Sequence, residues 1–415
     1  MGFRRPGVRG AVAMGSAAAV VAGVAVASTM TGSPSGAART ASAGADGTAT
    51  AADGAGADTT AADAASVGRA GDVLRAGVTK VRSDNGLPGV IGMVRDGGAT
   101  RYAAAGWGDQ FRHVPADPRA QFRIGSNTKA FTATVILQLE ARHRLSLDDK
   151  VAKYLPGVLA RNGYDGRKIT IRQLLNHTSG LQDYAGDVRV SGPYVADVDP
   201  NQRWAPRTLV DIATDKKPVA APGKTWHYSN ANYVLAGMII QRVTGRAPAV
   251  EVRDRIIKPL GLRHTTYPTS DPKLYGNWLH GYTLPRDISF SNVQVFGAAG
   301  AIVSTQEDLA NFSRALLTGR LLKPKQQREL ETTVPVAKPA NGVGYGLGVI
   351  KAKTKCGPVL THNGAVLGYL SFWYSSPDGK RQVTVATNEY HLLPTKATES
   401  LGNAAIDAYC AIGRK

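Results

Sequence analysis

Alternating hydrophobic and polar positions predict strands near both ends of the chain and helices between them. Apolar runs at residues 89–95 and 100–106 have the pattern of strands, and Asp96-Gly97-Gly98-Ala99 between them predicts a hairpin turn. More β-rich runs lie near the C-terminus, at residues 346–351, 359–362, 368–374 and 381–387. From about residue 145 to residue 295 the chain is helical and loop-rich. We therefore expect an α/β (α+β) fold: an antiparallel sheet built from N- and C-terminal strands, flanked by helices, with an inserted, mostly helical subdomain.

One predicted helix begins directly after two residues that can do chemistry. Residues 130–145 are mostly apolar as far as Glu140, which indicates a buried helix. Ser126 lies at its first turn and Lys129 follows three residues later, so the two side chains share a face. A lysine in a closed apolar site loses its charged form by desolvation and can act as a base. The pair is therefore a nucleophile with its activator, or else a helix cap beside a solvated lysine.

The same Ser-x-x-Lys spacing occurs again at Ser270-Asp271-Pro272-Lys273. Here a proline stands inside the motif and no long apolar run follows, so the stretch predicts a turn. Of the two sites, only the one at Ser126 has the helical context that the chemistry needs.

The N-terminal part of the chain differs in composition from the rest. An arginine-containing segment precedes an apolar run at residues 11–26, and Ala25-Val26-Ala27 offers a small-residue cleavage site. We expect residues 1–27 to be a secretory signal peptide, with an uncleaved membrane anchor as the alternative. Residues 28–68 are almost wholly Ala, Gly, Thr, Ser and Asp, which predicts a disordered linker. The folded domain is then expected over residues 69–415.

The charge of the chain is strongly basic. Loss of the signal peptide removes three arginines and no acid, which lowers the formal charge from +19 to +16. A secreted protein of this charge would associate with polyanions such as an acidic cell wall. Nucleic acid is a weaker alternative, because no basic stripe with interleaved aromatic residues is visible. We expect no nucleic-acid partner, no membrane association after signal cleavage, and a monomer.

Cys356 and Cys410 are the only cysteines. In an oxidising compartment a single disulfide between them is the simplest expectation. No Cys/His cluster has zinc-ligand spacing and no His-Glu-x-x-His occurs, so we expect neither a metal nor an organic cofactor.

Two further triplets strengthen the chemical interpretation of Ser126. Tyr228-Ser229-Asn230 precedes an apolar helix, and His362-Asn363-Gly364 ends a predicted strand. The order Ser-x-x-Lys, Tyr-x-Asn, His-x-Gly resembles the penicillin-recognising serine hydrolases, and most of all the secreted streptomycete D-alanyl-D-alanine carboxypeptidases. The resemblance extends over about residues 70–412 and includes His177-Thr178-Ser179-Gly180 and the late cysteine pair. Tyr275-Gly276-Asn277 is a second Tyr-x-Asn, which we interpret as a loop.

The resemblance implies a role for each motif residue. Ser126 would attack a carbonyl and become acylated, while Lys129 and Tyr228 share the proton transfers, with Tyr228 as phenolate or proton relay. Asn230 would hydrogen-bond the substrate amide. His362 would support Tyr228 or an anionic substrate group, with a surface or capping histidine as the alternative.

The resemblance also implies a binding cleft around these residues. Gly364 would let the substrate backbone lie along the strand, or would be a plain turn glycine. The backbone N–H groups of Ser126 and Ala365 would form the oxyanion hole. Phe296 and Tyr184 are candidate cleft walls, although core packing is the alternative for both.

Three positions depart from the carboxypeptidase pattern. The groups that hold a substrate carboxylate in those relatives are replaced by Ile350, Asn363 and Ala365. Lys351 and Lys353 are the candidate substitutes, but Ile350 and Lys351, as neighbours on a strand, face opposite ways. The resemblance implies an extracellular serine acyl-hydrolase, similar to the D-alanyl-D-alanine carboxypeptidases, that acts on small peptides or peptidoglycan-like substrates and is acylated by β-lactams. A β-lactamase, an esterase, a D-amino-acid peptidase and a non-catalytic wall-binding protein remain as alternatives.

Overall fold

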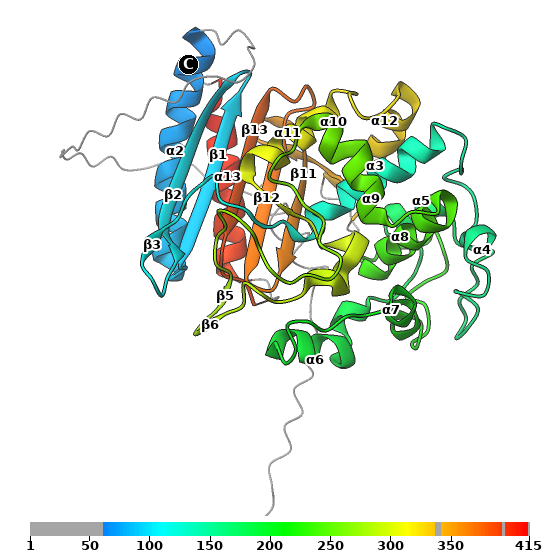
Figure 1. Cartoon of the computed structure of the whole chain (residues 1–415). Helices are drawn as coiled ribbons and strands as arrows, with labels where there is room; N and C mark the ends of the chain where they lie inside the picture. The colour runs from blue at the N-terminus through cyan, green and yellow to red at the C-terminus, as the bar shows by residue number, and fades with distance from the viewer. Residues whose placement is uncertain (1–60, 337–341, 392–394, 414–415) are drawn as a thin grey trace, which may run out of the picture.

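A nine-stranded antiparallel sheet forms the centre of the molecule (Figure 1). The computed structural model describes residues 61–336, 342–391 and 395–413. In spatial order the strands are β3 (Val114–Pro115), β2 (Ala99–Asp109), β1 (Gly89–Asp96), β13 (Arg381–Thr387), β12 (Tyr369–Ser375), β11 (Gly357–Val366), β10 (Ile350–Thr354), β9 (Val343–Tyr345) and β8 (Val334–Pro335). The N-terminal strand β1 pairs with the C-terminal strand β13, with Ile91 opposite Ala386. The predicted sheet built from both ends of the chain is confirmed.

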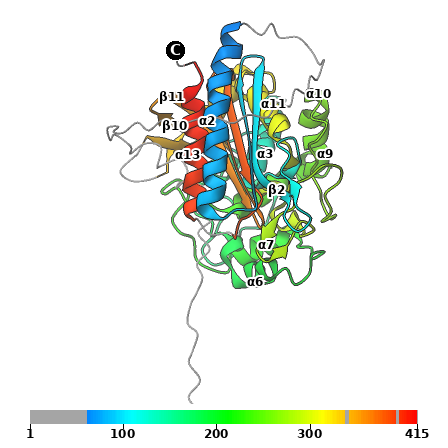
Figure 2. The ribbon, with the colours of Figure 1, turned by 90° about the vertical axis from the view of Figure 1, so that its left-hand side faces the viewer.

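Helices α2 (Ala61–Asn85) and α13 (Lys396–Ala411) lie side by side across one face of this sheet (Figure 2). The start of α2 corrects the predicted linker boundary, because residues 61–68 are helical and Val67 is buried. Alanine is the best helix former, so an alanine-rich segment continues the helix once one face can pack on its neighbours. The predicted signal peptide and the rest of the linker lie outside the described residues.

The opposite face carries α3 (Thr128–Glu140), α11 (Gln306–Leu317) and a helical region inserted between them (Figure 1). That region contains α4 (Val151–Tyr154), α5 (Ile171–Leu175), η3 (Tyr184–Gly186), α6 (Val188–Ala196), α7 (Pro206–Ala213), α8 (Asn230–Thr244), α9 (Pro248–Val252), η4 (Arg253–Ile257), α10 (Lys258–Leu260), the β5–β6 hairpin (Tyr282–Thr283 and Arg286–Asp287) and η5 (Val293–Ala299). Helix α12 (Pro324–Glu331) follows α11. No helix in these described ranges is long and apolar enough to cross a membrane.

Two features tie the C-terminal part of the chain together. Strand β11 continues to Val366, so His362-Asn363-Gly364 lies inside the strand rather than at its end. Cys356, in the turn between β10 and β11, is disulfide-bonded to Cys410 in α13, with their Cα atoms 5.4 Å apart. The predicted disulfide is confirmed, and it joins the sheet to the helix that covers it.

Candidate active site

Ser126 lies in a short helical turn, η2 (Gly125–Asn127), that leads directly into α3. The turn is fixed from two sides. Strand β4 (Phe122–Arg123) before it pairs with β7 (Val303–Ser304), and Asn127 donates a hydrogen bond to Ser371 Oγ on β12 at 2.9 Å. Ser126 does not cap α3, because no side chain makes a capping hydrogen bond at that helix start. Its hydroxyl is held by Lys129 and Tyr228 instead, which excludes the plain-cap interpretation.

The Lys129 amine is fully buried and surrounded by three oxygens. Its Nζ lies 2.9 Å from Ser126 Oγ, 2.8 Å from Asn230 Oδ1 and 2.8 Å from the Ala299 carbonyl oxygen. Burial lowers the pKa of Lys129 to about 7, although the nearby charge of Asp183 acts in the opposite direction. A neutral amine at this place can donate to Asn230 and Ala299 while its lone pair accepts the Ser126 proton. The geometry therefore suits a general base.

Tyr228 lies on the other side of the nucleophile. Its hydroxyl donates to Ser126 Oγ at 2.7 Å, and Lys129 Nζ lies 4.8 Å from the centre of its ring. The His177 ring packs against it, with ring centres 4.3 Å apart. Burial raises the pKa of Tyr228 well above its usual value. The phenol is therefore neutral in the free protein, which favours the proton-relay role over the phenolate.

Asn230 connects the lysine to an acid that sequence reasoning missed. Asp183 Oδ1 accepts the backbone N–H of Asn230 at 3.1 Å, and Oδ2 accepts its side-chain amide at 3.0 Å. This pairing points the Asn230 amide oxygen at Lys129. The one signal in the sequence was that Asp183 precedes Tyr184 at the start of a turn, where its carboxylate also accepts the Ala185 N–H. The expected contact of Asn230 with a substrate amide stays a prediction.

His362 is placed differently from the expectation. Its side chain has no exposed surface. Nδ1 donates a hydrogen bond to the carbonyl oxygen of the next residue, Asn363. Because a neutral imidazole has one N–H, Nε2 then accepts a hydrogen bond from the Tyr345 hydroxyl at 2.9 Å. Burial and the charge of Lys129 lower the pKa of His362 to about 3. A neutral imidazole has no positive charge to offer an anionic substrate group, and that role stays a prediction. The surface alternative is wrong, because His362 has no exposed surface. The described hydrogen bonds of His362 do not include Tyr228.

Gly364 allows β11 to approach the nucleophile turn. A Cβ at this position would lie 1.8 Å from the Ile124 carbonyl oxygen and 2.8 Å from Asn127 Nδ2. The glycine is therefore required by the protein's own backbone, and the plain-turn alternative is wrong because Gly364 lies within β11. The expected passage of a substrate along the strand stays a prediction. A Cβ on Gly125 would lie 2.6 Å from the backbone nitrogen of Ala365. The amides of Ser126 and Ala365 thus belong to adjoining segments, as the expected oxyanion hole requires.

Comparison with known proteins identifies the family of this chain. A family model described as Beta-lactamase matches residues 72–406. The chain belongs to the beta-lactamase family. It is a serine hydrolase of the penicillin-binding and beta-lactamase fold, as the order of its motifs indicated.

Relatives of this beta-lactamase-family chain include both penicillin-binding proteins and amidases. Penicillin-binding protein 4* of Bacillus subtilis (strain 168) is 27% identical over 335 residues, which are 74% of this chain and 71% of that protein. A D-stereospecific amidohydrolase from Streptomyces sp. has a TM-score of 0.74 and 39% identity, with 79% of this chain and 96% of that chain covered. The D-amino acid amidase of Ochrobactrum anthropi SV3, complexed with L-phenylalanine amide, has a TM-score of 0.70 and 25% identity, with coverages of 82% and 98%.

The two expected cleft walls have different outcomes in this member of the beta-lactamase family. Tyr184 is fully buried and donates to the Val295 carbonyl at 2.7 Å, so it belongs to the core and its assignment as a wall is wrong. Phe296 is near the nucleophile, because a Cβ on Gly300 would lie 2.9 Å from Phe296 Cβ and 3.6 Å from the Gly125 carbonyl carbon. Its ring packs edge-on against Tyr194 of α6. Phe296 therefore remains a candidate wall.

The structure also locates the three residues that depart from the carboxypeptidase pattern. Ile350 and Asn363 are buried and Ala365 is half-buried. Along β10 the residues alternate, so Ile350 faces the core while Lys351 and Lys353 are exposed. The expectation that Lys351 points away from the position of Ile350 is confirmed. None of positions 350, 363 and 365 in this beta-lactamase-family chain offers a cation to a substrate carboxylate.

Proposed function

We propose that the protein is a secreted serine amidohydrolase that cleaves amides and esters of D-amino acids, and short peptides containing them, through an acyl-enzyme on Ser126. One observation carries the proposal: Ser126 Oγ lies within hydrogen-bonding distance of both Lys129 Nζ, at 2.9 Å, and Tyr228 OH, at 2.7 Å. A nucleophile between a poised amine and a phenol has both groups that acyl transfer needs. The D-stereospecific amidohydrolase from Streptomyces sp. supports the substrate class.

Acylation would follow from the hydrogen bonds. Ser126 Oγ attacks the carbonyl carbon while its proton passes to neutral Lys129, and the carbonyl oxygen becomes an oxyanion facing the Ser126 and Ala365 amides. The carbon–nitrogen bond then breaks, and the leaving amine takes a proton from Tyr228, which recovers the proton that Lys129 received from Ser126. The first product is a free amine, and Ser126 carries the acyl group as an ester.

Deacylation reverses these roles with water as the nucleophile. Water adds to the ester carbonyl and gives its proton to the Lys129 and Tyr228 pair, and Ser126 Oγ leaves and recovers a proton. The sum is amide plus water giving acid plus amine, so the site needs no co-reactant.

The carboxypeptidase interpretation is less well supported than the amidohydrolase one. A terminal carboxylate is bound best by a fixed guanidinium, whereas position 350 is an isoleucine and His362 is neutral. Beta-lactams are expected to acylate Ser126, because the same nucleophile attacks any strained amide that enters the site. Secretion, suggested by residues 1–27, is part of the proposal.

The test compares wild type with Ser126→Ala and the matched control Ser270→Ala. We expect wild type and Ser270→Ala to hydrolyse D-phenylalanine amide and to gain the mass of a penicillin in intact-mass spectrometry, and Ser126→Ala to do neither. Hydrolysis or labelling that survives in Ser126→Ala would refute the nucleophile. An absence of both in folded wild-type protein would favour the non-catalytic wall-binding alternative.

A further inference from the structure

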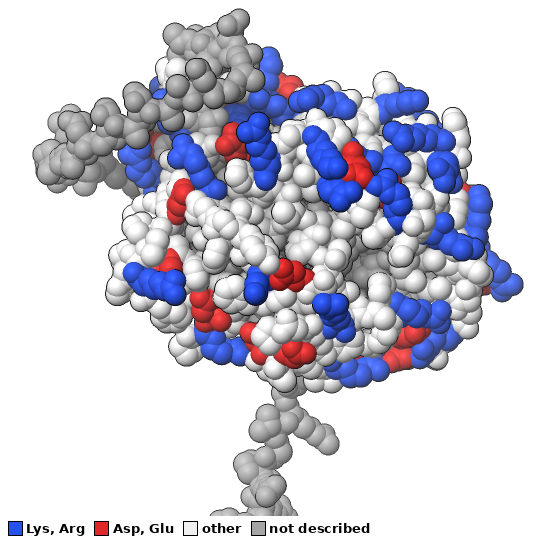
Figure 3. All heavy atoms as spheres, in the orientation of Figure 1, with Lys and Arg blue, Asp and Glu red and all other residues white. Residues whose placement is uncertain are grey.

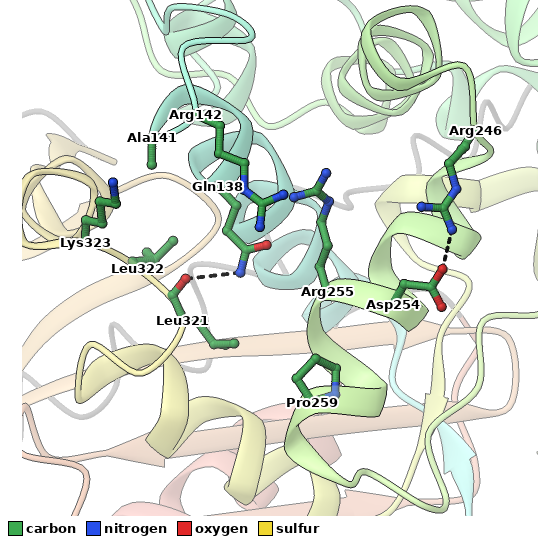
Figure 4. A pocket seen from close by; sticks show the side chains of 10 residues that line it. All are labelled: Gln138, Ala141, Arg142, Arg246, Asp254, Arg255, Pro259, Leu321, Leu322 and Lys323. Atoms are coloured by element: carbon green, nitrogen blue, oxygen red, sulfur yellow. Dashed lines mark hydrogen bonds and ion pairs between the residues drawn. The ribbon is translucent and has the colours of Figure 1, made fainter.

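A basic pocket lies at the far end of α3 from the nucleophile (Figure 4). It has a volume of about 430 Å³ and is formed by the end of α3, by η4 and α10, and by the segment before α12. Ser126 precedes the start of α3, and a helix of that length spans about 20 Å, so the pocket is separate from the active site. Its polar lining consists of Gln138, Arg142, Arg246, Asp254, Arg255 and Lys323.

Positive charge exceeds negative charge around this pocket. Glu251, which is buried, accepts from Arg255 and pairs with Arg246 at 3.0 Å. Asp254 also pairs with Arg246, and in addition with Arg253 and Lys258 on its outer side. Two acids are thus shared among four cations before Arg142 and Lys323 are considered. Lys and Arg gather over this end of the molecule, where α10 and α12 lie (Figure 3).

Two cationic side chains in the pocket, and one nitrogen of a third, lack partners among the described residues. Within the described part of the chain, no hydrogen bond or ion pair holds the side chain of Arg142 or of Lys323. Nη1 of Arg255 is buried and has no hydrogen-bond partner. Figure 4 shows the guanidinium groups of Arg142 and Arg255 pointing toward one another. Two like charges that face each other in a concave site repel unless an anion lies between them.

We propose that this pocket binds phosphate groups. Arginine presents a planar fork of donors that matches a phosphate oxyanion. Arg142 and Lys323 are exposed at the rim, whereas Arg255 Nη1 is a buried donor without a partner and gains most from such a ligand. The pocket is larger than one phosphate needs, which fits a diphosphate or consecutive units of a phosphodiester polymer. A phosphate-rich polymer bound here would hold the enzyme in place without entering the catalytic site.

The experiment uses two probes, inorganic pyrophosphate and poly(glycerol phosphate), with binding measured by titration calorimetry at low and at physiological salt. The variants are Arg142→Glu and Lys323→Glu, and Arg75→Glu is the matched control. Arg75 is exposed on α2, on the other face of the sheet, and its reversal changes the net charge equally. D-amino-acid amide hydrolysis is followed in the same preparations, so a failure here is distinguishable from a failure of the proposed function.

We expect both probes to bind wild type, and each pocket reversal to weaken binding about tenfold or more, with hydrolysis unchanged. Arg75→Glu should change affinity less than about twofold, because exposed charges beyond a Debye length are screened. Tighter binding of the polymer than of pyrophosphate would identify a polymer as the source of the phosphate. The proposal is overturned if neither probe binds, or if Arg75→Glu weakens binding as much as Arg142→Glu does.

Discussion

Asp183 holds Asn230 by two hydrogen bonds, one to the backbone N–H at 3.1 Å and one to the side-chain amide at 3.0 Å. Because the amide is held in this way, its oxygen faces Lys129 Nζ at 2.8 Å. Asp183 acts on the lysine a second time through its charge, which opposes the lowering of the Lys129 pKa by burial. Asp183 is therefore a positioning residue that also sets how readily the base gives up its proton.

The first prediction concerns the pH dependence of acylation. Neutral Lys129 is the active form, so kcat/KM for an uncharged amide should be lost as pH falls through about 7. Asp183→Asn removes the anion that favours charged Lys129, so this limb should move to lower pH. The measurement is kcat/KM from pH 5 to pH 9 for both proteins. Asp165→Asn, which removes a surface carboxylate, is the control, and a limb that moves equally in the control would refute the role of Asp183.

The second prediction concerns stability. The pKa of Lys129 is about 7 in the folded protein, whereas its ordinary value, taken for the unfolded chain, is 10.5. Between these two pH values the unfolded chain therefore binds more protons than the folded protein does. The free energy of unfolding of wild type, relative to Lys129→Met, should therefore rise with pH across that window, by an amount on the order of a few kcal/mol. Urea unfolding of both proteins at pH 7 and pH 9.5 measures this difference. A difference that is flat or falls with pH would show that the amine is not desolvated.

Gly364 provides the third prediction. A methyl group at this position would lie 1.8 Å from the Ile124 carbonyl, which forces β11 away from the nucleophile turn. Gly364→Ala should destabilise the protein by on the order of 1–3 kcal/mol and strongly reduce kcat. The control is Gly68→Ala on α2, where a methyl group would meet nothing within 4 Å. Thermal unfolding and amide hydrolysis measure both effects, and wild-type behaviour of Gly364→Ala would refute the close approach.

The site could be predicted from the sequence where the residues that define it lie close together along the chain. The relation of Ser126 to Lys129 follows from one turn of helix, and Tyr228 was found by its own triplet. Asp183 reaches Asn230 across 47 residues, and no spacing rule encodes such a contact. The His362 motif was visible, but its charge state depends on burial beside Tyr345, which only the packed fold determines.

The fold, too, was predicted where neighbouring residues determine it and missed where packing determines it. Hairpins such as the one after Asp96 were predicted because their turn residues adjoin the strands they join. Tyr184 was wrongly assigned to the cleft because an aromatic side chain near a motif carries no sign of which way it faces. The start of α2 was missed because an alanine-rich segment has the composition of a linker until α13 gives it a surface to pack on.

The disulfide provides the fourth prediction. It links Cys356 to Cys410 across a separation of 54 residues, for which the chain-entropy account gives about 4 kcal/mol of stabilisation. Cys410→Ser should therefore unfold at a lower temperature, and reduced wild type should match it. The measurement is thermal unfolding, together with thiol titration of denatured, unreduced protein. Two titratable thiols, or an unchanged unfolding temperature, would contradict the prediction.

The last prediction concerns what the leaving part of the substrate must carry. The terminal carboxylate of a D,D-peptide would find no cation at positions 350, 363 and 365, and His362 is neutral. Because a charge-assisted contact is typically worth about 1.5–3 kcal/mol, its absence removes roughly a ten- to hundredfold preference for the free acid. We therefore expect kcat/KM for a free-acid peptide to be no more than about tenfold above that of the amide or ester with the same acyl group.

The alternation of buried and exposed residues along β10 provides a variant and its control for this prediction. Arginine at position 350 would place a guanidinium where the relatives hold the substrate carboxylate, but Ile350 is only 1% exposed and lies in the core. A guanidinium placed there without an anion costs several kcal/mol, on the order of 3 or more, so Ile350→Arg should lower the unfolding temperature. Lys351→Arg, on the exposed side of the same strand, is the control and should not. If wild type already prefers the free acid by more than about a hundredfold, another cation holds the carboxylate and the substrate class proposed for this site is wrong.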